Sequence, residues 1–266
     1  MVVKNLFIYP IKSLGGISLQ QSEVTVRGLK YDRRWVLVDS NGRFITQRTL
    51  PHMALFSVGI EKDHLLVTHR TSGQFIRIPL EPETTEKQIV TVWDDEIEGV
   101  RVCDEADQWF SEHLGFTCYL YYQPEASIRK VDAKYQVSGH EHTSFSDAYP
   151  ALVIGEASLE DLNNRLEVKV EMKRFRPNIV TGGGEAFEED YLKRIKIGSA
   201  GLYGVKPCSR CILTTIDPDS DEPKHGSEPL KTLAGYRRVG NKVMFGHNLV
   251  VHQEGVISVG DEIVIL

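Results

Sequence analysis

The sequence has 266 residues, a length that fits one large β-rich domain or two modest ones. Hydrophobic residues make up 41% of it and charged residues 26%, as in ordinary soluble globular proteins. The net charge of −6 argues against a nucleic-acid-binding protein, which usually carries a basic face. Four cysteines are too few for a disulfide framework in a chain of this size.

The N-terminal segment runs directly into an apolar, strand-like pattern over residues 2–9. It has neither the long apolar core of a signal peptide nor the Arg- and Ser-rich composition of a transit segment. No apolar run approaches the roughly 20 residues that a membrane-spanning helix needs. We therefore expect a cytoplasmic protein that does not contact a membrane.

The first half of the chain predicts one short strand after another, separated by turn residues, as in a β-barrel or β-sandwich. The expected strands lie at residues 2–9, 35–38, 43–46, 55–60, 64–69, 74–79, 89–93, 100–103 and 119–122. The apolar spacing over residues 104–114 predicts a helix, and Gly115 is suited to end it.

The second half begins after a polar stretch, residues 123–149, which we interpret as a linker or a long functional loop. A buried strand is expected at residues 151–154, followed by a helix that Ser158 caps. Further strands are expected near Ile179, Ile195, Leu202 and Cys211, and at residues 243–252 and 262–266, with an acidic loop at 217–229 and a short helix at 229–236. The predicted domains are therefore residues 1–122 and residues 150–266.

The most informative motif is Cys208-Ser209-Arg210-Cys211, because it is followed by a β-branched run that favours a strand. A strand start disfavours dithiol redox chemistry, which needs a helix N-terminus, and no second ligand pair suggests structural zinc. Two alternatives stay open: a pair of small buried residues, or a functional thiolate that the neighbouring cations favour. Cys208 lies outside the strand alternation, so the two sulfurs need not bind one metal.

Three separate segments offer cations to an anion. Lys12 and Ser13 lie in a glycine-containing turn that suits phosphate, or is an ordinary hairpin turn. Arg33 can bind phosphate, or form a surface salt bridge with Asp32. Arg176 and Asn178 enter a strand and suit an anion and a heterocycle edge, or form a solvated charge run. Together with a strand-borne cysteine, these clusters suit an anionic cofactor whose metal takes a thiolate.

Several motifs together resemble the MOSC family, named after the C-terminal domain of molybdenum-cofactor sulfurase, and within it the amidoxime-reducing component of mitochondria and its bacterial relatives. The resemblance covers nearly the whole chain. It is carried by Tyr9-Pro10-Ile11-Lys12-Ser13, Asp32-Arg33-Arg34-Trp35, Ser146-Asp147, Phe175-Arg176-Pro177-Asn178-Ile179-Val180, Cys208-Ser209-Arg210-Cys211-Ile212-Leu213-Thr214-Thr215, Asp217-Pro218-Asp219 and Val259-Gly260-Asp261.

The resemblance implies a β-rich α+β fold, with an N-terminal β-barrel domain packed on a MOSC β-barrel domain and a few short helices. It also implies a molybdenum cofactor (molybdopterin) between the domains, with Cys211 as the metal ligand. Asp147 is implied as a polar group near the open side of the metal. The positions that match the cofactor contacts of the family are Lys12, Ser13, Arg33, Arg176, Asn178 and Ser209. Asn248 stands where animal members carry tyrosine, a departure from the pattern.

The function that follows from the resemblance is reductive cleavage of N–O bonds in small N-hydroxylated compounds, with Cys211 and Asp147 as catalytic candidates. The chain is expected to hold no iron–sulfur cluster. Its electrons are therefore expected from a separate protein of a ferredoxin- or cytochrome b5-type system. Two alternatives are a non-catalytic carrier of molybdenum cofactor or sulfur, and a β-rich binding module with buried cysteines. No nucleic-acid partner is expected.

Overall fold

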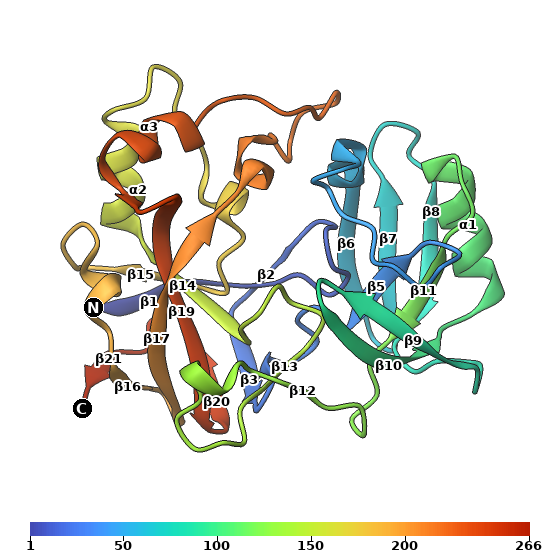
Figure 1. Cartoon of the computed structure of the whole chain (residues 1–266), viewed down its shortest axis with the longest axis horizontal. Helices are drawn as coiled ribbons and strands as arrows, with labels where there is room; N and C mark the ends of the chain where they lie inside the picture. The colour runs from blue at the N-terminus through green and yellow to red at the C-terminus, as the bar shows by residue number, and fades with distance from the viewer.

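The structure is a computed structural model that describes residues 1–266. Figure 1 shows two lobes, one built on a large sheet that carries both chain termini, the other built on smaller sheets with helix α1 (Asp104–Leu114). Strands dominate, and α2 (Glu156–Asn163) and α3 (Leu230–Tyr236) are the other two α-helices, beside several short 3₁₀ segments. The predicted β-rich α+β class is confirmed. None of the helices is both long and apolar enough to cross a membrane.

The first lobe is built on a nine-stranded sheet in the order β2-β1-β15-β14-β19-β17-β16-β21, with β18 paired to β19. Neighbouring strands run antiparallel except for β14 and β15, which are parallel. Their bounds are β1 (Val2–Ile8), β2 (Ile17–Leu19), β14 (Ala151–Gly155), β15 (Ile179–Gly182), β16 (Arg194–Ile197), β17 (Ala200–Arg210), β18 (Arg238–Val239), β19 (Lys242–Gln253) and β21 (Ile263–Ile265).

The start and the end of the chain meet in this first lobe. Strand β1 pairs with β15, and β3 (Gln21–Thr25) lies between β4 (Gly28–Leu29) and β20 (Gly255–Ser258). The amide of Val3 also donates to the carbonyl of Asp261 at 2.8 Å. The first 29 residues thus contribute strands to the lobe formed mostly by residues 150–266. The domain boundaries at 122 and 150 stay a prediction.

The second lobe contains a four-stranded sheet in the order β5-β11-β10-β9 and a three-stranded sheet in the order β6-β7-β8. Trp35, Phe56 and Phe110 are fully buried in its core, which α1 helps to cover. The strand bounds are β5 (Trp35–Val38), β6 (Phe56–Glu61), β7 (His64–His69), β8 (Phe75–Pro79), β9 (Lys87–Val92), β10 (Asp95–Arg101) and β11 (Tyr119–Tyr122).

The segment between the lobes is ordered by its own contacts. Its short strands β12 (Arg129–Lys130) and β13 (His142–Thr143) pair with each other. The buried carboxylate of Glu141 accepts hydrogen bonds from the amides of residues 137–139 and so closes this loop. Arg129 donates to the carbonyls of Ser144, Ser146 and Asp147 at 3.0, 2.5 and 3.1 Å. The backbone that carries Asp147 is therefore held in place.

The expectation of a strand at Cys211 was wrong. Strand β17 ends at Arg210, and Ile212–Thr215 form a 3₁₀ turn instead. The hydroxyls of Thr214 and Thr215 donate to the carbonyls of Cys211 and Ile212 at 3.0 and 2.7 Å. Such local side-chain bonds compete with a sheet ladder, and here they outweigh the β propensity of the run.

Three smaller expectations also failed. Helix α2 begins at Glu156, and Ser158 does not cap it, because the Ser158 hydroxyl donates to Glu189 at 2.7 Å. Residues 43–46 form only isolated bridges, one of them between Phe44 and Val38. Strand β9 ends at Val92, so Trp93 lies in the turn that follows.

Candidate functional site

A cavity of about 280 Å³ is lined by segments from both lobes and from the segment between them. All eight site residues predicted from the sequence line it, although they are spread over two hundred positions of the chain. They are Lys12, Ser13, Arg33, Asp147, Arg176, Asn178, Ser209 and Cys211. Asn248 lines it too. The structure therefore brings these residues to one place, while their individual roles stay predictions.

The cavity is strongly cationic although the chain as a whole carries a net charge of −6. Only one carboxylate, Asp147, lines it. Six cations face it: Lys12, Arg33, Arg48, Arg176, Lys206 and Arg210. With all of them ionised, six positive charges against Asp147 and against Asp32, which is paired with Arg33 outside the lining, leave a local excess of +4. A concave site with such an excess attracts an anionic ligand.

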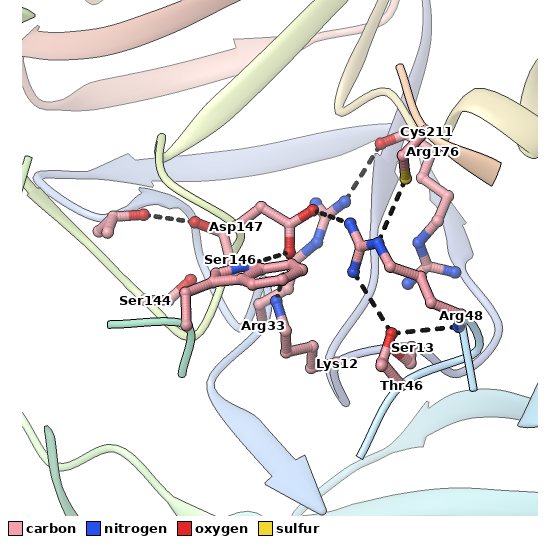
Figure 2. Close-up of polar contacts among 12 residues, drawn as sticks. Lys12, Ser13, Arg33, Thr46, Arg48, Ser144, Ser146, Asp147, Arg176 and Cys211 are labelled. Carbon is pink, nitrogen blue, oxygen red and sulfur yellow. Dashed lines mark hydrogen bonds and ion pairs between the residues drawn. The ribbon is translucent and has the colours of Figure 1, made fainter. Parts of the chain in front are cut away.

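Asp147 joins two of these cations (Figure 2). Its Oδ1 accepts from Lys12 Nζ at 2.7 Å, and its Oδ2 accepts from Arg48 Nη2 at 2.7 Å. Burial acts to raise the pKa of Asp147, but Lys12 and Arg48 outweigh it and hold the pKa well below its usual range. Burial also lowers the pKa of Lys12 to about 8, against the opposing attraction of Asp147. Asp147 is thus an ionised acceptor at neutral pH, and Lys12 exchanges its proton close to neutrality.

Arg48 connects this ion pair to the cysteine, and the sequence reasoning missed it. Its Nε donates to Cys211 Sγ at 3.2 Å, and its Nη1 donates to Thr46 Oγ1 at 3.3 Å (Figure 2). Its guanidinium also lies over the ring of Trp93, 4.7 Å from the centroid. The only sequence signal was a single arginine two residues after the strand expected at residues 43–46, which is weaker than the pair Arg33-Arg34.

Arg33 is held by buried partners. Its Nη1 donates to both carboxylate oxygens of Asp32 at 2.8 and 2.6 Å, and Asp32 is almost fully buried. The salt bridge between Asp32 and Arg33 that the sequence suggested as an alternative is therefore present, but it is buried rather than at the surface. The Asn178 amide oxygen accepts from Arg33 and from the amide of Leu152, and its nitrogen donates to the carbonyl of Phe7. Asn178 thereby joins strands β1 and β14 to Arg33 and has little capacity left for a ligand.

Two guanidinium groups pack on the ring of Tyr9. Arg33 lies 4.3 Å and Arg176 lies 4.1 Å from its centroid. Burial lowers the pKa of Arg176 to about 10, and the nearby charge of Arg33 adds to the effect. Arg176 Nη1 also donates to the carbonyl of Leu14 at 2.7 Å. Two charged groups held this close in a buried place repel each other, so an anion between them would relieve a cost already present.

The two cysteines of the motif have separate partners. Arg48 donates to Cys211, whereas Arg210 Nη1 donates to Cys208 at 3.0 Å. Both thiols are free and half-buried, and neither belongs to a cluster of side chains with the spacing of a metal site. The two sulfurs therefore have different neighbours, while the expectation that they need not bind one metal stays a prediction. Ser209 between them is exposed at the cavity.

Backbone strain gathers at the cavity. Ser13, Arg33 and Arg176 have left-handed φ values of 69°, 50° and 54°, and Trp93, in contact with Asp147, has 59°. Such conformations cost about 1 kcal/mol or more each for residues other than glycine, and they cluster at ligand sites. Four of the seven such residues in this chain lie at one place. This concentration marks the cavity as the functional site.

The fold and this cavity define a class of two-lobed β proteins with a cationic ligand site and a cysteine at its wall. Residues 1–117 match the family model of the MOSC N-terminal beta barrel domain, and residues 140–264 match that of the MOSC domain. The chain belongs to the MOSC family, which confirms the resemblance found in its motifs.

Its relatives include mitochondrial amidoxime-reducing component 1 of Mus musculus, with 36% identity over 99% of this chain and 82% of the relative. The same component of Homo sapiens is 35% identical over the same shares of the two chains. Molybdenum cofactor sulfurase of Solanum lycopersicum is 31% identical over 98% of this chain but only 35% of that protein.

Proposed function

We propose that this protein binds a molybdenum-containing pterin cofactor in the cationic cavity and reduces N–O bonds of N-hydroxylated compounds. The observation that carries the proposal is the combination of a local charge excess with a free cysteine in the wall of the same cavity. Several relatives at 33–36% identity are named amidoxime-reducing components, and this supports the proposal.

The residues present fit such a cofactor. Its phosphate is an anion, and buried guanidinium groups are the side chains best suited to bind one. Arg33 and Arg176 on Tyr9 would hold the phosphate, with Lys12 and Ser13 beside them. Asn178 fixes Arg33, and Ser209 would offer a polar group to the pterin. Arg210 Nε is buried without a partner, so the cavity wall has a donor still to be satisfied. A thiolate is a ligand that suits a soft metal centre, and Cys211 would supply it.

When bound, the cofactor supplies the two-electron redox chemistry that N–O cleavage needs. The overall reaction breaks the N–O bond, consumes two electrons and two protons, and releases the amine or amidine with water. Asp147 is held as a carboxylate, so in this reaction it accepts a hydrogen bond from the substrate rather than giving a proton. Lys12, with a pKa of about 8, lies against Asp147 and is the group that can deliver a proton near neutral pH.

Electrons would come from a separate protein, a ferredoxin- or cytochrome b5-type donor. A cytoplasmic location is part of the same proposal. The similarity to a molybdenum cofactor sulfurase favours one second candidate, a carrier that holds the cofactor or a persulfide and transfers it. Such a carrier would contain bound cofactor but would not turn over an N-hydroxylated substrate.

The test compares Cys211→Ala with Cys208→Ala, two variants of the same motif. Each protein is made in a host that synthesises the cofactor and is assayed for molybdenum content and for benzamidoxime reduction with an artificial electron donor. We expect Cys211→Ala to lose both metal and turnover, and Cys208→Ala to retain most of each. Wild-type protein that holds molybdenum without turnover would favour the carrier, and equal losses in both variants would contradict the role of Cys211.

A further inference from the structure

Trp93 lies beside the cavity, where it contacts the lining residues Asp147 and Arg48, and its side chain and its backbone are both unusual. It lies in the turn between β9 and β10, and 41% of its surface is exposed. Its φ of 59° is in the left-handed region, where a bulky residue is strained. It belongs to none of the four hydrophobic clusters that form the cores. A large aromatic ring held at this cost outside a core calls for a role beyond packing.

The neighbours of Trp93 fix the ring beside the reactive part of the cavity. Its Nε1 donates to Asp147 Oδ1 at 3.3 Å, and the guanidinium of Arg48 lies 4.7 Å from its centroid. Phe44 packs against it in an edge-to-face arrangement with centroids 5.1 Å apart. The ring contacts Asp147 directly. Because Arg48 contacts Cys211 and Asp147 contacts Lys12, one side chain separates the ring from Cys211 and from Lys12.

We propose that the exposed part of Trp93 is a stacking platform for the substrate, and that Asp147 beside it accepts a hydrogen bond from an N–H or O–H group of the same molecule. This inference rests on the proposed function and deepens it by naming the class of compound that the site prefers. A flat, conjugated N-hydroxylated compound satisfies both contacts at once. An aliphatic one reaches Asp147 but leaves the indole without a partner.

The pairing of a ring with a carboxylate explains why the platform is an indole. Aromatic rings attract one another best when offset or edge-on, and a larger ring offers more area for this contact. The bond from Nε1 to Asp147 fixes the rotation of the ring about its side chain, so less rotamer freedom is lost when a ligand binds. Arg48, over the ring, restrains it further.

The experiment compares benzamidoxime with acetamidoxime, which carry the same reacting group on a ring or on a methyl. In the holoenzyme we expect Trp93→Ala to raise KM for benzamidoxime about 10-fold and to change KM for acetamidoxime by less than about 2-fold, as expected for loss of one aromatic contact. Trp93→Phe, which keeps a ring, is expected to fall between wild type and Trp93→Ala. Benzamidoxime should also quench the tryptophan fluorescence of the wild type, and this quenching should be lost in Trp93→Phe.

Phe75→Ala is the matched control, because Phe75 is also an exposed ring with an arginine over it, Arg77 at 5.3 Å, but Arg77 does not line the cavity, whereas Trp93 contacts Asp147 and Arg48, which do. It should leave both KM values unchanged. Equal KM increases for the two substrates in Trp93→Ala would overturn the platform, since the ring would then act only by positioning Asp147. Unchanged fluorescence quenching in Trp93→Phe would overturn it as well. Quenching by benzamidoxime without turnover of either compound would instead refute the proposed function while leaving the stacking site in place.

Discussion

Lys12 holds a buried charge that costs stability, so replacing it with methionine should stabilise the protein. Burial lowers its pKa from 10.5 to about 8 even with Asp147 at 2.7 Å. Because each tenfold change in acidity is worth about 1.4 kcal/mol, holding the charged form at pH 7 costs about 3 kcal/mol. Lys12→Met removes that cost. The pKa of about 8 already includes the attraction of Asp147, which keeps Arg48 as a partner, so no further loss is subtracted for the ion pair. The net expectation is a gain of about 3 kcal/mol at pH 7.

The pH dependence provides a second measurement of the same charge. The folded pKa of Lys12 lies below its unfolded value, so between pH 8 and pH 10.5 the unfolded chain keeps a proton that the folded chain has released. The free energy of unfolding of the wild type should therefore rise with pH through this window because of Lys12. Lys12→Met should lose that part of the rise. Urea unfolding of cofactor-free protein, followed by circular dichroism from pH 7 to pH 10, measures both effects.

Lys30→Met is the matched control for this substitution. Lys30 is well exposed and pairs with Glu23 at 2.8 Å, and the pairing raises its pKa. Its replacement should lower the free energy of unfolding by no more than about 0.5 kcal/mol, as for other surface pairs. If Lys12→Met were less stable than the wild type at pH 7, or if the difference between the two proteins did not narrow above pH 8, the reasoning would be refuted.

Three further outcomes are expected. Asp147→Asn removes the single carboxylate of the cavity, so inorganic phosphate should bind the cofactor-free protein several-fold more tightly by calorimetry, and weaker binding would contradict the charge argument. Arg48→Met keeps most of the length of the side chain but loses the bonds to Asp147 and Cys211. We expect benzamidoxime turnover to slow by about tenfold or more, with most of the molybdenum retained. Arg43→Met, in the same segment but outside the cavity, should change neither the turnover nor the molybdenum content. Gly28→Ala should destabilise the fold by about 3 kcal/mol or more in thermal unfolding, because Gly28 has a φ of 97° and the new Cβ would lie 2.1 Å from the carbonyl oxygen of Pro150. A soluble Gly28→Ala protein with an unchanged melting temperature would show that this contact relaxes freely.

The regular elements were predictable because their signals are local. Helix α1 occupies residues 104–114 and ends at Gly115 in a left-handed conformation, as the apolar spacing and the glycine indicated. Strand β11 also matches its expected bounds. The turn after Cys211 was missed because two threonine hydroxyls bind nearby carbonyls there, and β propensity does not reveal whether a hydroxyl will do so.

The candidate site was partly predictable for a different reason. Lys12, Arg33, Arg176 and Cys211 occur in motifs whose residue types already suit an anion and a metal. Arg48 lies in no such motif, and only its contact with Cys211, 163 positions away, identifies it as a site residue. The sequence predicts Trp93 as the end of a strand, because an apolar residue after a β-branched run gives no sign of a left-handed backbone. Local sequence patterns do not predict contacts between distant segments or the backbone conformation of an individual residue.

The pairing of the first strands with the last has a consequence for synthesis of the chain on the ribosome. Strand β1 emerges first, but its partner β15 follows more than 170 residues later, and β20, the partner of β3, comes near the very end. Translation at about 5–20 residues per second leaves one edge of β1 and one edge of β3 without its partner strand for many seconds. The smaller lobe, whose strands lie between residues 35 and 122, can fold in the meantime. The lobe that holds Cys211 can then close only once β20 has been synthesised, so a nascent chain stalled before residue 255 should expose unpaired strand edges and recruit chaperones.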